Sequence, residues 1–302
     1  FFLKGKGRAQ VQIYRKAIKA RARMDLWFPD TSRRRFSLPG MDPGGSLFIL
    51  ILLCLLLNAF SDSVIRSQLG RPIPGVRTDG GVPGHGGPFC AAWKFAVETN
   101  DAGPWKTVPR PCVRFVERYM KGVRYLSDSK AVAAYSLAFA KTVNVSGDGK
   151  DAWVFDIDET LLSNFDYYAI RDFGGDTFNE ASFNEWVKSG QATALPASLE
   201  LYKKLELLGF TIFLLTGRDE PLRNITVKNL HSVGYTGWRK LILRGSPAQG
   251  KKAVVYKSEK RKELEELGYR IRGSSGDQWS DLFGFSTAQR SFKLPNPMYY
   301  IA

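Results

Sequence analysis

The feature that most restricts the fold of this chain is an alternation of short apolar runs and helical patterns from residue 151 onward. The runs at 153–157, 210–215, 241–243 and 269–272 are expected to be strands, and helices are expected at 196–208, 221–232 and 252–267. Strands separated by amphipathic helices indicate a parallel sheet with right-handed crossovers. The sequence therefore predicts an α/β fold. Ligands bind such sheets beyond the carboxyl ends of the strands, so functional residues should follow each apolar run.

Two carboxylates follow the first apolar run. Asp156 and Asp158 are two residues apart, and both can face one site where the chain leaves the strand. Such a pair can divide two tasks. One carboxylate stays ionised, holds a divalent cation and attacks phosphorus, while the other gives a proton to the leaving alcohol and later takes one from water. A solvated acidic turn is the alternative interpretation.

A short polar stretch, Thr216-Gly217-Arg218, follows the second run. A hydroxyl and free backbone N–H groups between a strand and a helix form a small anion nest that suits a phosphoryl oxygen. Arg218 can add a bidentate donor. The alternative is that Arg218 pairs with Asp219 or Glu220.

A lysine near the start of the 252–267 helix is the third candidate. Lys257 as a fixed ammonium would neutralise charge on the nucleophile and on the phosphate oxygens. Spacing alone does not single it out, because Lys251, Lys252 and Lys260 are close by.

Two further carboxylates follow the fourth run. Asp277 can complete an octahedral Mg²⁺ site with Asp156 and the carbonyl of Asp158, and Asp281 can hold or orient ligands beside it. A surface turn would explain the same residues. Four strand ends in order, each with a fitting group, favour the catalytic interpretation.

An aromatic-rich insert separates the first two strands, and residues 163–197 are expected to form a small cap over the site. Phe165, Tyr167 and Tyr168 are predicted to contact the alcohol part of a substrate. The alternative is that these rings pack the core of the insert itself.

Helical patterns at 91–98, 112–121 and 127–143 precede the first strand, with Ser127 and Asp128 as caps of the last. Residues 70–88 hold seven Gly and four Pro, a composition typical of a linker. We expect a linker over 64–88 and one folded domain over 89–302.

The segment before the linker is expected to lie outside the fold. Residues 1–40 carry 11 Lys/Arg and two Asp, and we interpret them as a non-native or untranslated extension. Residues 41–63 are predicted to be a signal peptide, because the apolar run 47–60 is too short for a comfortable membrane span. A membrane anchor is the alternative, since the short stretch between Met41 and the apolar run lacks the Lys or Arg that is usual in a signal peptide. After signal cleavage no stable membrane span is expected.

Cysteine usage agrees with export. Cys54 leaves with the signal peptide, so Cys90 and Cys112 remain, and one disulfide is the economical interpretation, with two buried free thiols as the alternative. The sequons at Asn144 and Asn224 could be glycosylated in that compartment. The predicted location is the secretory pathway, ending in the extracellular space, the cell wall or the vacuole.

The distribution of charge and the two histidines argue against a nucleic-acid-binding protein and against histidine-dependent phosphatases. Most of the net charge of +15 comes from residues 1–40, and the chain from residue 61 onward carries 33 basic and 26 acidic residues without a basic-aromatic stripe, so no nucleic-acid partner is expected. His85 and His231 lack suitable neighbours for a phosphohistidine or dinuclear metal mechanism.

The residues from about Phe89 to Ala302 resemble the plant acid phosphatase (class B) and vegetative storage protein family of the haloacid dehalogenase (HAD) superfamily. The resemblance is carried by SGDGKDAWVFDIDETLLSN, LLTGRDE, YKSEKRKELEELGYRI, SGDQWSDLFG and RSFKLPNPMYYIA. It implies a HAD-like Rossmannoid sheet with N-terminal helices and a small cap.

The resemblance also implies an activity: Mg²⁺-dependent hydrolysis of small phosphate monoesters at acid pH. Asp156 would be the nucleophile, Asp158 the general acid and base, and Asp277 the remaining metal ligand, with Thr216 and Lys257 binding phosphate. Some members of the family have lost the nucleophile and serve as storage proteins, which is the alternative function here, although this chain keeps Asp156. A homodimer is left open.

Overall fold

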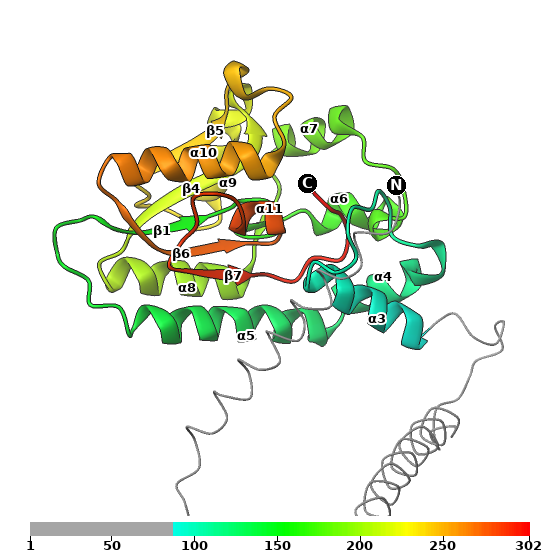
Figure 1. Ribbon diagram of the computed structural model, residues 1–302. Coiled ribbons are helices and arrows are strands. Elements are labelled where there is room, and N and C mark those ends of the chain that lie inside the picture. The colour runs from blue at the N-terminus through cyan, green and yellow to red at the C-terminus, as the bar shows by residue number, and fades with distance from the viewer. Residues whose placement is uncertain (1–86) are drawn as a thin grey trace, which may run out of the picture. The chain divides into compact units, whose positions relative to one another are not determined.

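A five-stranded parallel sheet forms the centre of the protein (Figure 1). The computed structural model describes residues 87–302. The strands follow the order β5-β4-β1-β6-β7 and span β1 Asp151–Phe155, β4 Thr211–Asp219, β5 Lys240–Arg244, β6 Arg270–Gly276 and β7 Arg290–Lys293. The predicted α/β class is confirmed. The predicted extension 1–40, the signal peptide 41–63 and linker residues 64–86 lie outside the described residues.

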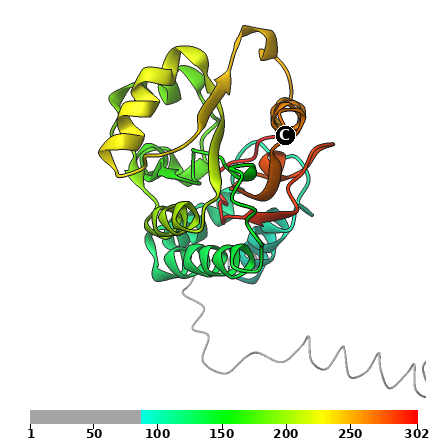
Figure 2. The same ribbon diagram turned by 90° about the vertical axis from the view of Figure 1, so that its left-hand side faces the viewer.

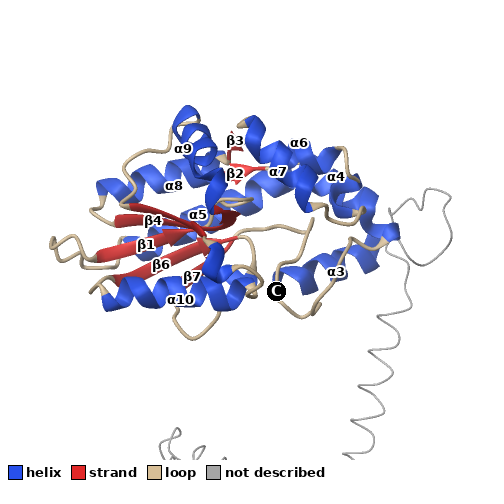
Figure 3. Ribbon diagram, turned by 90° about the horizontal axis from the view of Figure 1, so that it is seen from above, coloured by secondary structure: helices blue, strands red, loops and turns tan. Residues whose placement is uncertain are grey.

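Helices cover both faces of the sheet. α5 (Val123–Ala140), α8 (Pro196–Leu207) and α9 (Arg223–Ser232) pack on one face, where α5 and α8 lie side by side (Figure 2), and α10 (Ala253–Glu266) covers the other (Figure 3). β1 serves both layers because successive side chains of a strand alternate. Trp153 packs towards α5 and α8, whereas Val154 packs towards α10.

Two parts of the sheet were not expected from the sequence. β7 is short and partly polar, with Phe292 as its buried apolar side chain. β6 extends beyond the predicted 269–272 through Gly273, Ser274 and Ser275. The Trp153 ring lies against the face that carries Gly273 and Ser275, and its indole N–H donates to Ser275 Oγ at 3.0 Å. A Cβ on Gly273 would lie 2.4 Å from that ring. Because these residues are small, the apolar pattern of the sequence did not indicate that the buried strand continues here.

The N-terminal helices form a second layer beside the cap. α3 (Gly87–Glu98) already includes Gly87 and Pro88, so the predicted linker ends too late; proline fits the first turn of a helix. After the 3₁₀ turn Arg110–Cys112, α4 (Val113–Lys121) leads to α5. Gly122, not Ser127 or Asp128, is the N-terminal cap of α5, so that cap prediction was wrong.

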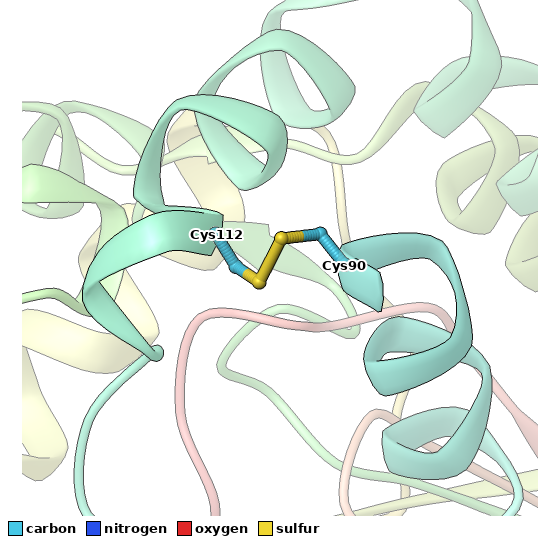
Figure 4. The surroundings of a disulfide bond; sticks show 2 residues. All are labelled: Cys90 and Cys112. Atoms are coloured by element: carbon cyan, nitrogen blue, oxygen red, sulfur yellow. A yellow bond between two sulfur atoms is a disulfide. The ribbon is translucent and has the colours of Figure 1, made fainter. Parts of the chain in front are cut away.

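The predicted disulfide joins α3 to the start of α4 (Figure 4). Cys90 and Cys112 are fully buried with Cα atoms 5.2 Å apart. They belong to an apolar cluster shared with the cap and with the segment around Met298. No helix between residues 87 and 302 is long and apolar enough to cross a membrane.

The cap lies between two short antiparallel strands, β2 (Leu162–Ser163) and β3 (Thr193–Ala194). It contains α6 (Phe165–Ala169), the 3₁₀ turn Asp172–Gly174 and α7 (Glu180–Ser189). Because the chain enters and leaves the cap through paired strands, the insert does not interrupt the central sheet.

Candidate active site

The carboxyl ends of the strands bring the predicted residues together. Asp156 directly follows β1, where its backbone N–H donates to the carbonyl of Ser275 at 3.0 Å. Asp277 directly follows β6, and Asp281 lies on the short helix α11 (Trp279–Leu282). Lys257 reaches the same place from α10. Parallel strands therefore gather residues that are up to 125 positions apart.

A buried ion pair forms the centre of the site. Lys257 Nζ donates to Asp156 Oδ1 at 2.6 Å and also to Asp281, and both Lys257 and Asp156 are almost fully buried. Burial alone would lower the pKa of Lys257, but the charges of Asp156 and Asp281 hold that pKa above its ordinary value. Lys257 is therefore a fixed cation. The competing lysines point elsewhere: Lys251 pairs with Glu259, and Lys260 with Glu263.

Three carboxylates are arranged as cation ligands. Oxygens of Asp156, Asp277 and Asp281 lie within 4.8 Å of one another, and all three residues are buried. Burial, with the charge of Asp281, raises the pKa of Asp277 to about 6. Burial also raises the pKa of Asp156, because the charge of Lys257 offsets only part of the free energy needed to bury an ionised carboxylate. A cluster of hard oxygen ligands with too little positive charge fits a divalent cation such as Mg²⁺.

Asp158 faces a different partner. Arg218 donates to both of its carboxylate oxygens, with Nη2 to Oδ1 at 2.7 Å and Nε to Oδ2 at 3.0 Å. Burial alone would raise the pKa of Asp158, but the Arg218 charge and hydrogen bonds outweigh it and lower that pKa. The alternative partners considered for Arg218, Asp219 and Glu220, pair with Gln249 and Arg223 instead. The side chain of Asp158 is also absent from the three-carboxylate group, which argues against a side-chain metal contact.

The predicted anion nest differs from expectation. Thr216, Gly217 and Arg218 lie inside β4, at an irregularity in its pairing with β5, instead of between the strand and a helix. Thr216 is fully buried, and its Oγ1 accepts the backbone N–H of Arg218 at 3.1 Å. Gly217 is exposed and lines the cavity described below. The irregularity thus presents backbone to the site without a helix terminus.

A cavity of about 320 Å³ opens above these residues. Its floor holds Asp156, Asp158, Asp277 and Lys257, and one side of its wall is rich in aromatic residues. The wall residues come from the cap, from the loop before α4 and from the C-terminal segment: Tyr168, Phe178, Phe183, Lys106, Tyr299, Tyr300 and Ile301.

One of the three predicted cap contacts lines this cavity. Tyr168 does so and stacks on Tyr299, with ring centroids 5.2 Å apart. Phe165 packs against Phe173, and Tyr167 packs against Phe183. Neither Phe165 nor Tyr167 lines the cavity, so these two belong to the core of the insert and that prediction was wrong.

Several polar residues that hold the carboxylates were missed. Asn164 Nδ2 donates to Asp158 at 2.9 Å, and its Oδ1 accepts the indole N–H of Trp186 from the cap. Gln278 and Asn296 donate to Asp277 at 2.8 and 2.7 Å. Their amides resemble ordinary turn residues, so no local pattern distinguishes them.

Glu159 is a further buried acid that the sequence did not single out. It is fully buried, accepts the backbone N–H of Asn164 at 2.6 Å and the Tyr125 hydroxyl at 3.3 Å, and has the positive φ of 51°. Burial raises its pKa to about 8. Glu159 therefore links α5 to the turn that carries Asp158.

Comparison with known proteins places the chain in a family. The family model described as "HAD superfamily, subfamily IIIB (Acid phosphatase)" matches residues 84–302. Acid phosphatase 1 of Solanum lycopersicum is 51% identical over 212 residues, which are 70% of this chain and 83% of that relative. Vegetative storage protein 1 of Arabidopsis thaliana is 39% identical over 216 residues, which are 71% of this chain and 79% of that relative.

A solved structure shares the fold. The class C acid phosphatase from Bacillus anthracis has a TM-score of 0.53 and 25% identity, and the match covers 62% of this chain and 84% of that chain. The sheet and its carboxylates define an α/β phosphohydrolase of the HAD superfamily. The chain belongs to subfamily IIIB of that superfamily, the acid phosphatases, and is an enzyme of this family.

Proposed function

We propose that the protein hydrolyses small phosphate monoesters through an aspartyl-phosphate on Asp156. The observation that carries the proposal is the buried Lys257–Asp156 pair on the floor of the cavity, beside Asp277 and Asp281. Lys257 holds the Asp156 carboxylate in place and stays charged, so it can also neutralise the oxygens of an incoming phosphate. An ionised carboxylate attacks phosphorus without first losing a proton.

The proposed cofactor is Mg²⁺, held by Asp156, Asp277 and Asp281. When bound, it would neutralise charge shared by these carboxylates and the phosphate oxygens. Gln278 and Asn296 fix Asp277 by hydrogen bonds, and the backbone N–H of Gln278 donates to Asp281 at 2.9 Å. These bonds keep two ligands in position before the substrate arrives.

Asp158 is proposed as the proton carrier. In the first step the proton on Asp158 moves to the ester oxygen as its bond to phosphorus breaks. In the second step ionised Asp158 takes a proton from the water that attacks the aspartyl-phosphate, which releases phosphate and restores Asp156. Arg218 lowers the pKa of Asp158, so a lower pH is needed to populate the protonated form that the first step uses. This supports an acid pH optimum.

The test compares wild type with Asp156→Asn in the hydrolysis of 4-nitrophenyl phosphate at about pH 5, with Mg²⁺ and with a chelator. We expect a loss of about 10⁴-fold or more in kcat, because the nucleophile is removed. Asp166→Asn, an exposed acid of the cap, is the matched control and should keep full activity. Equal rates for Asp156→Asn and wild type would refute the aspartyl mechanism.

A storage role is the second candidate, because vegetative storage protein 1 is among the relatives. The intact carboxylate cluster and Lys257 favour catalysis. The same assay separates the two: a storage protein would turn over substrate no faster than Asp156→Asn.

We also propose that the protein enters the secretory pathway and reaches the extracellular space, the cell wall or the vacuole. The Cys90–Cys112 disulfide supports an oxidising compartment. Asn144 and Asn224 are exposed and are the proposed glycosylation sites. Sequencing the N-terminus of the mature protein and removing N-glycans would test signal cleavage near residues 60–65 and both sites. Light scattering would test the proposed homodimer.

A further inference from the structure

Part of the cavity wall comes from a loop that precedes the α/β domain. This loop, residues 99–112, lies between α3 and α4 and is closed by the Cys90–Cys112 disulfide. Lys106 from the loop lines the cavity together with the catalytic carboxylates. The loop is therefore part of the substrate site, although it is about 50 residues before Asp156 in the chain.

The residues on both sides of Lys106 are anchored. Val108, almost fully buried, donates its backbone N–H to the carbonyl of Gly174 in the cap at 2.8 Å. The Trp105 ring lies 5.3 Å from Trp93 and 6.3 Å from Tyr300. The disulfide closes the loop at its base. Together these contacts fix the position of the Lys106 backbone relative to the cavity.

Lys106 differs from the other cations of the cavity. Arg218 is paired with Asp158, and Lys257 with Asp156 and Asp281. Arg244 donates to the carbonyls of Ala248 and Lys251. Lys106 is exposed and forms no ion pair with any residue between 87 and 302. Its ammonium is thus available to an anion in the cavity.

The surroundings of Lys106 identify which part of a substrate it meets. Lys106 also lines a small crevice with Tyr168, Phe178 and Tyr299, three of the aromatic residues of the wall. Arg171 and Asp176 line this crevice as well, and neither forms an ion pair with Lys106. The reacting phosphate must lie against Asp156 and Lys257 on the floor, so the alcohol part of the ester occupies the aromatic side. An anion that reaches Lys106 therefore belongs to the leaving group.

We propose that Lys106 forms a subsite for a second anionic group, a carboxylate or a second phosphate, on the leaving alcohol of the substrate. The proposal rests on the proposed phosphatase function and deepens it. Glu180, an exposed acid of the cap, lines the same cavity and opposes such an anion. Its replacement by glutamine should therefore act in the opposite direction to the loss of Lys106.

The test measures kcat/KM for four aryl phosphates that differ in one substituent. Phenyl phosphate and 3-carbamoylphenyl phosphate are the uncharged references, 3-carboxyphenyl phosphate carries a carboxylate, and 1,3-phenylene bisphosphate carries a second phosphate. For wild type we expect the charged substrates to be preferred over the carbamoyl compound. In Lys106→Met this preference should fall about fivefold, mainly through KM, because a partly exposed ion pair contributes this order of magnitude.

The controls separate charge from folding. Lys106→Arg should retain the preference, Glu180→Gln should increase it, and Lys130→Met, which removes an exposed lysine of α5 outside the cavity, should leave it unchanged. The ratio of kcat/KM between the two uncharged substrates should be the same in wild type and Lys106→Met. Comparing the two charged substrates shows which anion is preferred.

Two results would overturn the proposal, and they have different meanings. If wild type hydrolyses all four compounds and Lys106→Met keeps the same ratios, the subsite is wrong while the phosphatase function stands. If wild type hydrolyses none of them faster than Asp156→Asn, the proposed function fails and the subsite fails with it.

Discussion

The two ends of β1 carry buried carboxylates in opposite electrostatic situations. At the amino end, Asp151 accepts hydrogen bonds from Arg270, Arg272 and Ser146, and the Arg270 contact in particular lowers its pKa. At the carboxyl end, Asp156 shares one lysine with Asp281, and burial raises its pKa. Asp151, which has two arginine partners, and Asp156, which shares one lysine with another carboxylate, are only five positions apart. The comparison indicates that one end of the strand serves stability and the other serves chemistry.

After the loss of the nucleophile itself, the largest effect that would test this comparison is expected at the proposed metal ligand Asp277. Asp277→Asn should reduce kcat about a thousandfold and abolish the response to Mg²⁺, because one charged ligand is lost. The melting temperature of the metal-free variant should not fall below that of wild type, since a crowded buried charge is removed. Kinetics with a Mg²⁺ titration, and calorimetry with chelator, measure both. A variant with a much lower melting temperature and full activity would show instead that Asp277 serves stability and not chemistry.

Asp158→Asn should give the next largest effect, and it should depend on the leaving group. Alkyl phosphates need a proton on the departing oxygen, so their kcat should fall about a hundredfold, whereas 4-nitrophenyl phosphate should lose much less in the first step. Brønsted plots of rate against leaving-group pKa for wild type and variant would show this. Parallel plots would contradict the proton-carrier role.

At the other end of β1, Asp151→Asn should lower stability by roughly 1–2 kcal/mol and leave kcat almost unchanged, because it removes the charge of a buried carboxylate that pairs with two partly exposed arginines far from the cavity. The folded-state pKa of Asp151 is lowered, so its stabilisation is complete above the unfolded value of 3.8 and is lost as pH falls through the folded value. Urea unfolding should therefore show the same gap between wild type and variant at about pH 7 and about pH 5, and a smaller gap below about pH 4. A gap that widens on acidification would be evidence against this account.

Loss of the disulfide is expected to change substrate preference slightly and turnover hardly at all. Replacing Cys90 and Cys112 together by Ser should lower stability by roughly 3 kcal/mol, from the closure of a 22-residue loop. Turnover of phenyl phosphate per folded molecule should persist, since all the proposed catalytic groups lie beyond residue 150. The preference for charged leaving groups should weaken, because Lys106 lies in the loop that the bond closes. An unchanged preference in the double variant would show that Trp105 and Val108 hold the loop without the disulfide.

The sheet and the clustering of the carboxylates at its edge could be predicted because their signals are local. An apolar run followed by Asp156 predicts both a strand and a carboxylate at its carboxyl end. Parallel pairing then brings the carboxyl ends of the strands together. The partner of Arg218 could not be predicted, because Asp158 lies 60 residues away and no local pattern encodes that contact. Likewise, aromatic content marks the insert but does not distinguish Tyr168, which lines the cavity, from Tyr167, which packs the core of the insert.

The contact of Gly174 with two distant segments has a consequence for the order of folding. Its carbonyl accepts the N–H of Val108, and a Cβ at Gly174, whose φ is +89°, would lie 1.8 Å from the carbonyl oxygen of Met298. A nascent chain that has reached residue 282 already holds Lys257 and the carboxylates Asp156, Asp158, Asp277 and Asp281, yet it still lacks β7 and the segment around Met298. During synthesis, all the groups of the reactive centre are therefore available to fold before the Met298 segment that completes the packing around Gly174.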